Sequence, residues 1–308
     1  MKRRLVLVYN PNSSHFKKME KKVLRPARKR EDLELVEFQV KRVVVERNVT
    51  ALTKILKKGD LVVSMGGDGT ATMTLNAILK SGKEGIFFGV LGYGNFNDVA
   101  MTIGSENFDD ILDTVDVGEV REVWPVECHL DGKLWRYGMG YFTVGMMAEA
   151  CSTFEERKNR KELKRGDKSV VFSVWRLFTW WRKNRKKEFL PEVFCVDGEE
   201  NKKKSDILVL NGRRMGKLIR GGMNASRPDE MLFYTGKMSS WAGILGFMLR
   251  SMLFGMPSEI RRKATIEFDK KTQVMIQGEG EFKKTKVKKI ELIKSRKSVF
   301  VTGTGAKV

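Results

Sequence analysis

The sequence predicts an α/β N-terminal domain with a parallel sheet, followed by a C-terminal, mainly antiparallel β domain. Up to about residue 122, apolar runs of strand length alternate with segments whose apolar residues recur at helical spacing, which is typical of α/β folds. From about Trp124 onward, short β-like runs follow one another. The length of 308 residues, with 41% hydrophobic residues, fits two domains that each bury a core.

The N-terminal part alternates expected strands with expected helices. The strands cover residues 5–9, 33–40, 61–65 and 86–91. A helix is predicted after each of the first three strands. The first has Phe16, Met19 and Val23 on one face, the second covers residues 49–56 after an Asn48 cap, and the third covers residues 71–80. Polar loops end three strands, at residues 10–14, 66–70 and 92–98. In an open parallel sheet such carboxyl ends face one crevice, where ligands bind.

The C-terminal part consists of β-like runs with two insertions. The runs cover residues 123–130, 134–144, 192–196, 206–210, 264–268, 274–276 and 287–293. A basic segment at 155–187 and an apolar one at 239–254 interrupt them. We expect a first domain at 1–122, completed by about 294–308 because a last strand near 299–301 returns to it. The second domain then covers residues 123–293.

The pentapeptide Gly66-Gly67-Asp68-Gly69-Thr70 has the outline of a phosphate-binding turn. Its glycines let the backbone approach a ligand with N–H groups exposed, and the following helix would add a positive N-terminus. A polyphosphate would repel Asp68 unless a divalent cation or a proton transfer uses the carboxylate. The turn therefore favours metal-nucleotide chemistry, and the alternative is a structural turn with Asp68 as helix N-cap.

Lysine and arginine exceed the acidic residues by 59 − 38 = +21, and the pI is about 9.9. This excess favours an anionic partner, which can be nucleic acid, nucleotide phosphate or an acidic membrane surface. The three cysteines are far apart and only two histidines are present, so we expect no zinc site. Unpaired cysteines of this kind also predict a reducing, cytoplasmic compartment. The longest apolar stretch, residues 241–256, carries Arg250 and is shorter than a spanning helix, so any membrane association is expected to be peripheral.

Four motifs form a set: Asn10-Pro11 with Ser13, the turn at 66–70, Asn97-Asp98 with Ala100, and Gly278-Glu279. This set resembles that of the bacterial diacylglycerol kinase-like lipid kinases, whose catalytic domain also occurs in sphingosine and ceramide kinases. The resemblance runs over nearly the whole chain. It implies the two-domain architecture that these enzymes share with NAD kinase, with ATP and Mg²⁺ as cofactors.

The resemblance also implies which residues bind the nucleotide and the metal. The nucleotide-binding residues would be Asn10, Pro11, Asn12, Ser13, Ser14, Gly66, Gly67, Asp68, Gly69, Thr70, Ala71, Thr72, Asn95 and Asn97. Asp68 would lie near the magnesium-bound phosphates, and Asn95 stands where the family usually has a threonine. A structural magnesium site would use Ser226, Asp229 and Met231, where Glu230 replaces the glycine of the family's Asp-Gly-Leu loop.

The late motif departs from the family pattern Asp-Gly-Glu and reads Gln277-Gly278-Glu279. By the resemblance, Glu279 is the catalytic base that takes the proton from the lipid hydroxyl. A carboxylate at 277 can bind magnesium or tune the pKa of its neighbour, whereas Gln277 can only hydrogen-bond. Glu281 would share a strand face with Glu279 if the strand continued, and would supply the missing charge. The alternative is that Glu279 is a surface strand carboxylate.

Residues 170–187 place aromatic side chains at helical spacing beside a basic tail, which suits a lipid interface. We expect Trp175, Trp180 and Trp181 to contact the membrane, the last two at headgroup level. The alternative is a helix packed in the core with a solvated basic end.

The sequence thus predicts an ATP- and Mg²⁺-dependent lipid kinase, a phosphotransferase acting on the alcohol group of a diacylglycerol-like lipid at an anionic membrane surface. A non-catalytic nucleotide- or phospholipid-binding relative is one alternative, motivated by Gln277, Asn95 and Glu230. NAD kinase, which shares the glycine turn, is another, although the long basic and aromatic insertions speak against it. Nucleic-acid binding rests on charge alone, without a recognition module. The sequence leaves a homodimer open.

Overall fold

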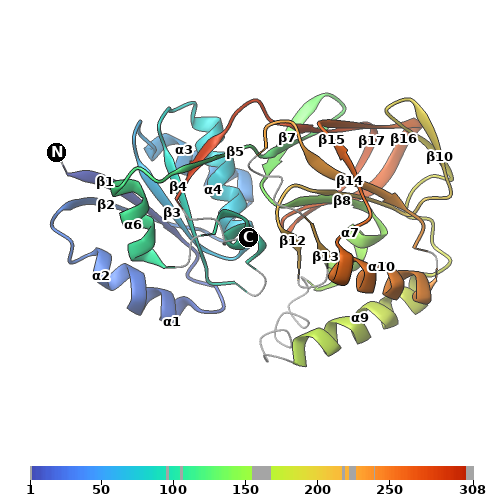
Figure 1. Cartoon of the computed structure of the whole chain (residues 1–308), viewed down its shortest axis with the longest axis horizontal. Coiled ribbons are helices and arrows are strands. Elements are labelled where there is room, and N and C mark those ends of the chain that lie inside the picture. The colour runs from blue at the N-terminus through green and yellow to red at the C-terminus, as the bar shows by residue number, and fades with distance from the viewer. Residues whose placement is uncertain are drawn as a thin grey trace. The chain divides into compact units, whose positions relative to one another are not determined.

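A computed structural model describes residues 2–94, 97–104, 107–154, 168–216, 219–221, 227–238 and 240–302, with backbone only for residues 154 and 168–173. The chain divides into two compact units (Figure 1). The first comprises Met1–Pro125, Ala225–Pro228 and Ser295–Val308, and the second comprises Val126–Asn224 and Asp229–Lys294.

Within the described residues, the first unit holds a six-stranded sheet in the order β2-β1-β3-β4-β18-β5. The strands are β1 (Arg3–Tyr9), β2 (Leu33–Gln39), β3 (Leu61–Gly66), β4 (Phe87–Gly92), β5 (Arg121–Val123) and β18 (Val299–Val301). Neighbours are parallel from β2 to β18, and β5 is antiparallel at the edge. All residues of the central β3 are buried, because helices cover both faces of a parallel sheet.

The helical segments of this unit are α1 (Phe16–Met19), the π-helical η1 (Glu20–Leu24), α2 (Arg25–Ala27), α3 (Val45–Ile55), α4 (Asp68–Ser81), α5 (Asp98–Ile103) and α6 (Phe108–Asp116). Helix α4 begins at Asp68, earlier than the helix predicted from residue 71. The prediction that Asn48 caps α3 is wrong, because Val44 holds that position. The buried Asn48 amide instead bonds both the N–H and the C=O of Lys41, each at 3.0 Å, and so fixes the loop after β2.

The second unit holds, among the residues described, a ten-stranded sheet whose paired strands are antiparallel. The strands are β6 (Val126–Leu130), β7 (Lys133–Gly138), β8 (Tyr141–Gly145), β9 (Val193–Val196), β10 (Glu199–Lys202), β11 (Asp206–Leu210), β14 (Met231–Gly236), β15 (Glu259–Arg261), β16 (Lys263–Gly278) and β17 (Glu281–Lys294). The runs predicted at 264–268 and 274–276 form one strand, β16, whose register shifts between Glu267 and Thr272. A short pair, β12 (Arg214–Met215) and β13 (Ile219–Arg220), lies apart from this sheet.

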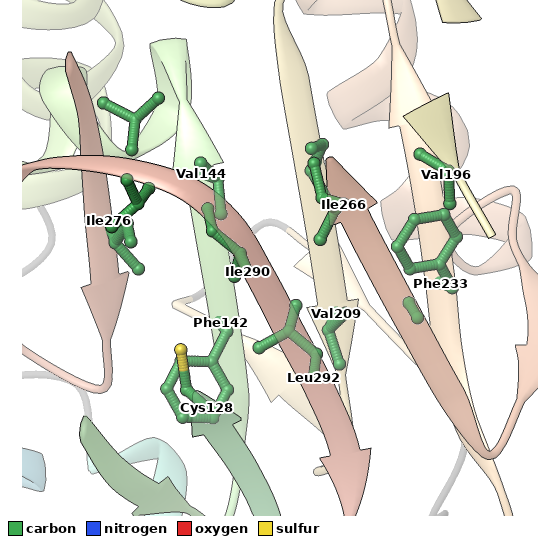
Figure 2. Packing of buried hydrophobic residues seen from close by; sticks show 14 of the residues in the cluster. Cys128, Phe142, Val144, Val196, Val209, Phe233, Ile266, Ile276, Ile290 and Leu292 are labelled. Carbon is green, nitrogen blue, oxygen red and sulfur yellow. The ribbon is translucent and has the colours of Figure 1, made fainter. Parts of the chain in front are cut away.

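One face of this sheet carries the core of the unit, and helices pack on the other side. Phe142, Val144, Ile276, Ile290 and Leu292 lie in the core with no more than 1% of their surface exposed (Figure 2). The helices are α7 (Met146–Phe154), α9 (Lys168–Asn184) and α10 (Trp241–Phe254). Helices α9 and α10 lie side by side, with the ring of Trp241 packed on α9 (Figure 1). These two units are the fold class that the sequence predicts.

Candidate active site

The pentapeptide at 66–70 forms the junction between β3 and α4. Gly66 ends the strand, and Gly67 is the N-cap of α4 with extended backbone (φ −93°, ψ −176°). A Cβ on Gly66 would lie 2.6 Å from Thr70 Oγ1, and a Cβ on Gly94 would lie 2.5 Å from the Cα of Gly67. These glycines are therefore required by packing within the unit.

Gly69 differs from these neighbours, because a Cβ at this position would meet no atom of the described residues within 4 Å. It lies in the first turn of α4, where the N–H groups of Thr70 and Ala71 donate to the C=O of Gly67, at 3.0 and 3.2 Å. The start of α4 thus places the positive helix end beside a glycine that no packing contact in the unit requires.

Asp68 is half-buried at the first position of α4, so it is not the N-cap that the structural alternative assigned. Its Oδ1 accepts a hydrogen bond from the N–H of Val99, at 2.9 Å, in the first turn of α5. The carboxylate therefore ties the starts of two helices together and has a fixed orientation.

Asn97 fixes the loop between β4 and α5. Its backbone is left-handed (φ 56°), a conformation that asparagine tolerates. Its side chain accepts from the N–H of Gly94 at 2.8 Å and donates to the C=O of Gly94 at 3.2 Å. The predicted nucleotide contact of Asn97 would thus add to a role in shaping the loop, whereas Asn95 lies outside the described residues.

The loop after β1 lies at the same edge of the sheet. The N–H of Asn10 donates to the C=O of Met65 at 3.3 Å, and Asn10 Oδ1 accepts from the N–H of Asn12 at 2.9 Å. The hydroxyl of Ser13 is buried and has no hydrogen-bond partner within the part of the chain that the structure describes. Pro11 and Ser14 are half-buried in this loop, while Ala71 and Thr72 are buried in α4 with 1% exposure each.

Glu279 lies in the second unit, in the two-residue turn that joins β16 and β17. Glu279 and Gly280 both have left-handed backbone (φ 46° and 83°), as a tight hairpin turn of this kind requires. The side chain is fully buried, and its Oε1 accepts a hydrogen bond from the N–H of Gly140. Burial rules out the alternative of a surface carboxylate.

The turn also overturns the expectation for Glu281. Glu281 begins β17 opposite Gly278, so it does not continue a strand that contains Glu279. Its carboxylate lies 4.0 Å from the guanidinium of Arg136. Glu281 therefore does not share a strand face with Glu279, so the expectation that it replaces the missing aspartate is wrong.

Gln277 is 3% exposed and lies opposite Thr143 in the ladder between β16 and β8. Its Oε1 accepts from the Thr143 hydroxyl at 3.3 Å, and its Nε2 donates to the Tyr141 hydroxyl at 3.2 Å. Both ends of the amide are thus held by neutral hydroxyl groups.

Sequence reasoning missed two buried residues beside Glu279. Asn211 is fully buried, and it bonds the C=O of Gly140 through its N–H and the C=O of Met139 through its Nδ2, at 2.7 and 2.8 Å. Its Oδ1 accepts from the ammonium of Lys294, which is 1% exposed. Burial lowers the pKa of Lys294 to about 7, against the opposing charges of Asp229 and Glu230. Asn211 thereby holds the chain segment whose N–H bonds Glu279.

The predicted structural magnesium site is described only in part. Asp229 lies exposed in a bend, the side chain of Met231 is buried in β14, and Ser226 lies outside the described residues. Where the structure describes the chain, no group of three or more histidine, cysteine, aspartate or glutamate side chains is placed to hold a metal ion.

The three tryptophans predicted to contact lipid differ in exposure. Trp175 is 59% exposed on α9. Trp180 and Trp181 are half-buried, with ring centroids 5.4 Å from Phe189 and 6.0 Å from Trp241, respectively. They line a cavity of about 300 Å³. Of the helices described, none combines the length and the apolar character needed to cross a bilayer.

Comparison with known proteins identifies the first unit. Residues 4–128 match the model of the diacylglycerol kinase catalytic domain. This part of the chain is similar to diacylglycerol kinase catalytic domains. This match confirms, for the first unit, the family resemblance noted in the sequence. The match covers the loop after β1, the turn into α4 and the Asn97 loop.

Solved structures with the same fold cover the whole chain. A diacylglycerol kinase from Bacillus anthracis str. Sterne is 14% identical, with a TM-score of 0.64 over 99% of this chain and 98% of that one. A second structure assigned to a diacylglycerol kinase of the same strain is 14% identical, with a TM-score of 0.66 over 99% of this chain and 100% of that one. At this identity the likeness concerns the fold. A search of curated proteins finds no match.

Proposed function

We propose that the protein is an ATP- and Mg²⁺-dependent lipid kinase that phosphorylates the hydroxyl of a diacylglycerol-like lipid at a cytoplasmic, anionic membrane surface. The observation that carries the proposal is the first turn of α4, where the pentapeptide meets a helix N-terminus within the part of the chain that is similar to diacylglycerol kinase catalytic domains. Phosphoryl transfer requires mainly positioning and neutralisation of charge, together with a base for the acceptor.

The residues of the first unit fit a nucleotide. The positive N-terminus of α4 can attract phosphate oxygens, and Gly69 adds no side chain to hinder them. The buried hydroxyl of Ser13 would gain a partner from such a ligand. The Asp68 carboxylate, oriented by Val99, would hold Mg²⁺, and the ion would neutralise charge on the phosphates.

Glu279 serves in this proposal as the general base. As the lipid oxygen attacks the terminal phosphorus of ATP, the carboxylate takes its proton, and the bond from phosphorus to the leaving oxygen of ADP breaks. The hydrogen bond from Gly140 and the tight turn hold the carboxylate in one orientation. Gln277 favours a second candidate, a non-catalytic relative that binds nucleotide without transfer, because its amide replaces the family's carboxylate.

We expect Glu279→Gln to reduce lipid phosphorylation roughly 10²- to 10⁴-fold, the usual contribution of a general base. The substitution keeps an oxygen that can accept from Gly140, so the turn and the unfolding temperature should change little. The assay incubates the protein with labelled ATP, Mg²⁺ and a panel of lipid extracts, and separates labelled lipid.

Glu281→Gln is the matched control, since this side chain belongs to the next strand and should leave the rate unchanged. ATP binding without labelled lipid from any extract would favour the non-catalytic relative. Transfer to NAD instead of lipid would favour the NAD kinase alternative. Equal rates for the Glu279→Gln variant and the wild type would remove Glu279 from the mechanism.

A further inference from the structure

Helix α10 is apolar on the face that packs and on the face that meets solvent. Ile244, Phe247 and Met248 are buried against the second unit. On the other face, Leu249, Leu253 and Phe254 are 58%, 72% and 84% exposed. A surface helix of a soluble protein normally places charged and polar side chains there. Exposed apolar side chains gathered on one helix mark a surface that contacts something other than water.

The surroundings of this face add further apolar surface. Trp175 is 59% exposed on α9, the helix that lies beside α10 (Figure 1). Residues 255–258 connect α10 directly to β15. We call Leu249, Leu253 and Phe254 the outer face of α10.

The charges near the outer face are mainly positive. Arg250 is the charged residue in the sequence of α10, and it is exposed between the apolar positions. Arg220 is exposed where its carbonyl accepts from the N–H of Met256 at the end of the helix. At the other end of α10, where Trp181 of α9 contacts Trp241, exposed basic side chains lie beside the exposed Glu188: Arg182, Lys183, Arg185, Lys186 and Lys187. The nearby acid, Glu259, pairs with Arg261 at 2.6 Å.

This combination selects one kind of occupant. Apolar side chains ringed by arginine fit the boundary between acyl chains and phosphates of an anionic membrane. A second copy docked face to face would bring Arg250 of each helix together, and α10 contains no acid to compensate. The net charge of +21 adds long-range attraction to an anionic surface.

We propose that the outer face of α10, led by Leu253 and Phe254, inserts into the interface of an anionic membrane. This inference rests on the proposed function, because a lipid kinase must reach a substrate held in a bilayer. It assigns insertion to α10, whereas the sequence assigned it to Trp175, Trp180 and Trp181. Trp180 instead packs against the ring of Phe189, and Trp181 packs against Trp241 at the start of α10.

The test uses the full chain and two kinds of vesicle, phosphatidylcholine alone and equal parts of phosphatidylcholine and phosphatidylglycerol. The wild type should sediment with the anionic vesicles, and added salt should weaken this binding. Leu253→Gln with Phe254→Gln should lower the partition coefficient about tenfold or more, because two exposed apolar side chains are lost. The unfolding temperature should stay unchanged, because both side chains face solvent in the free protein.

Val117→Gln is the matched control, since this valine is 67% exposed at the end of α6 in the first unit and should not affect vesicle binding. Arg250→Gln should weaken binding to anionic vesicles and reduce its dependence on salt. Wild-type binding by the α10 double variant would overturn the proposal. So would conversion of a wild-type dimer into a monomer with vesicle binding unchanged, because a second copy would then cover this face.

Vesicle binding is measured without nucleotide, so this experiment tests the membrane inference separately from the proposed kinase activity. A double variant that phosphorylates a water-dispersed, short-chain diacylglycerol at the wild-type rate, yet no longer binds vesicles, supports the insertion surface. Vesicle binding through α10 by a protein that phosphorylates no lipid would keep this inference and refute the proposed kinase activity.

Discussion

At the scale of single residues, the glycines of the pentapeptide differ in whether packing requires them. Gly66 is required by the side chain of Thr70, whereas a Cβ on Gly67 would make only an ordinary contact with the Cα of Gly94, at 3.5 Å. Gly69 has helical surroundings and open space where a Cβ would stand, so the free protein would be at least as stable with alanine there. A glycine with no internal reason at a helix N-terminus points to a ligand that needs the space.

We expect Gly69→Ala to weaken binding of ATP with Mg²⁺ by about tenfold or more, equivalent to about 1.4 kcal/mol, because the new methyl group would meet the phosphates. The free energy of unfolding should stay the same or rise by up to about 1 kcal/mol, because alanine is the better helix former. Titration with nucleotide and denaturant unfolding measure the two quantities.

Gly66→Ala is the informative contrast, since its Cβ would lie 2.6 Å from Thr70 Oγ1 and should destabilise the free protein. If Gly69→Ala binds nucleotide as tightly as the wild type, the phosphates do not lie against the first turn of α4.

At the scale of elements, a strand was predictable where a continuous apolar run corresponds to a single strand. The apolar run at 61–65 became β3, and residues 206–210 became β11. The late motif was misread because alternation continues on both sides of the turn, from Gln277 to Val287. Sequence periodicity does not register a two-residue turn inside an alternating pattern, although Gly280 is its signal.

The turn at Glu279 and Gly280 can be tested through its left-handed backbone. Gly280→Ala should destabilise the protein by about 1–2 kcal/mol, because an L-residue with a side chain is strained at φ 83°. The lipid phosphorylation rate should fall as well, because the strain shifts the adjoining carboxylate of Glu279. Chemical denaturation and the lipid assay test both effects.

Gly198→Ala is a control with the same backbone strain, since φ is 87° there and the residue lies in the turn between β9 and β10. It should destabilise to a similar degree and leave the rate unchanged. A loss of rate equal in both variants would show that stability alone accounts for the effect.

At the scale of the whole molecule, the fold class followed from sequence, while the surroundings of the candidate base did not. Asn211 and Lys294 are far apart in the chain and meet because of how β17 and the segment after β11 are placed. Lys294 ends an alternating strand like any surface lysine, so no local pattern marks it as buried. The exposed side of α10 was equally hidden, because an apolar run predicts burial on all sides.

Two buried ionisable groups make stability depend on pH. Asp206 is fully buried, and burial raises its pKa to about 7 despite hydrogen bonds from the N–H of Met147 and the hydroxyl of Ser205, at 2.6 and 2.7 Å. Its pKa in the unfolded chain is about 3.9, so the folded protein keeps a proton that the unfolded chain releases. The stabilising effect is complete below about pH 4 and is lost as the pH rises to about 7.

Asp206→Asn should remove this dependence, because the amide is neutral at every pH and its oxygen can still accept from Met147. Relative to the wild type, the variant should therefore gain up to about 1.4 kcal/mol of stability per pH unit between pH 4 and 7. The pKa of Lys294 is about 7 in the folded protein and about 10.4 in the unfolded chain, so this lysine changes the stability only between these two pH values. Below about pH 7 its effect on the free energy of unfolding is the same in the wild type and the variant. Urea unfolding of both proteins at pH 5 and pH 7 measures the difference, and a constant difference would show that Asp206 is ionised in the folded state throughout this range.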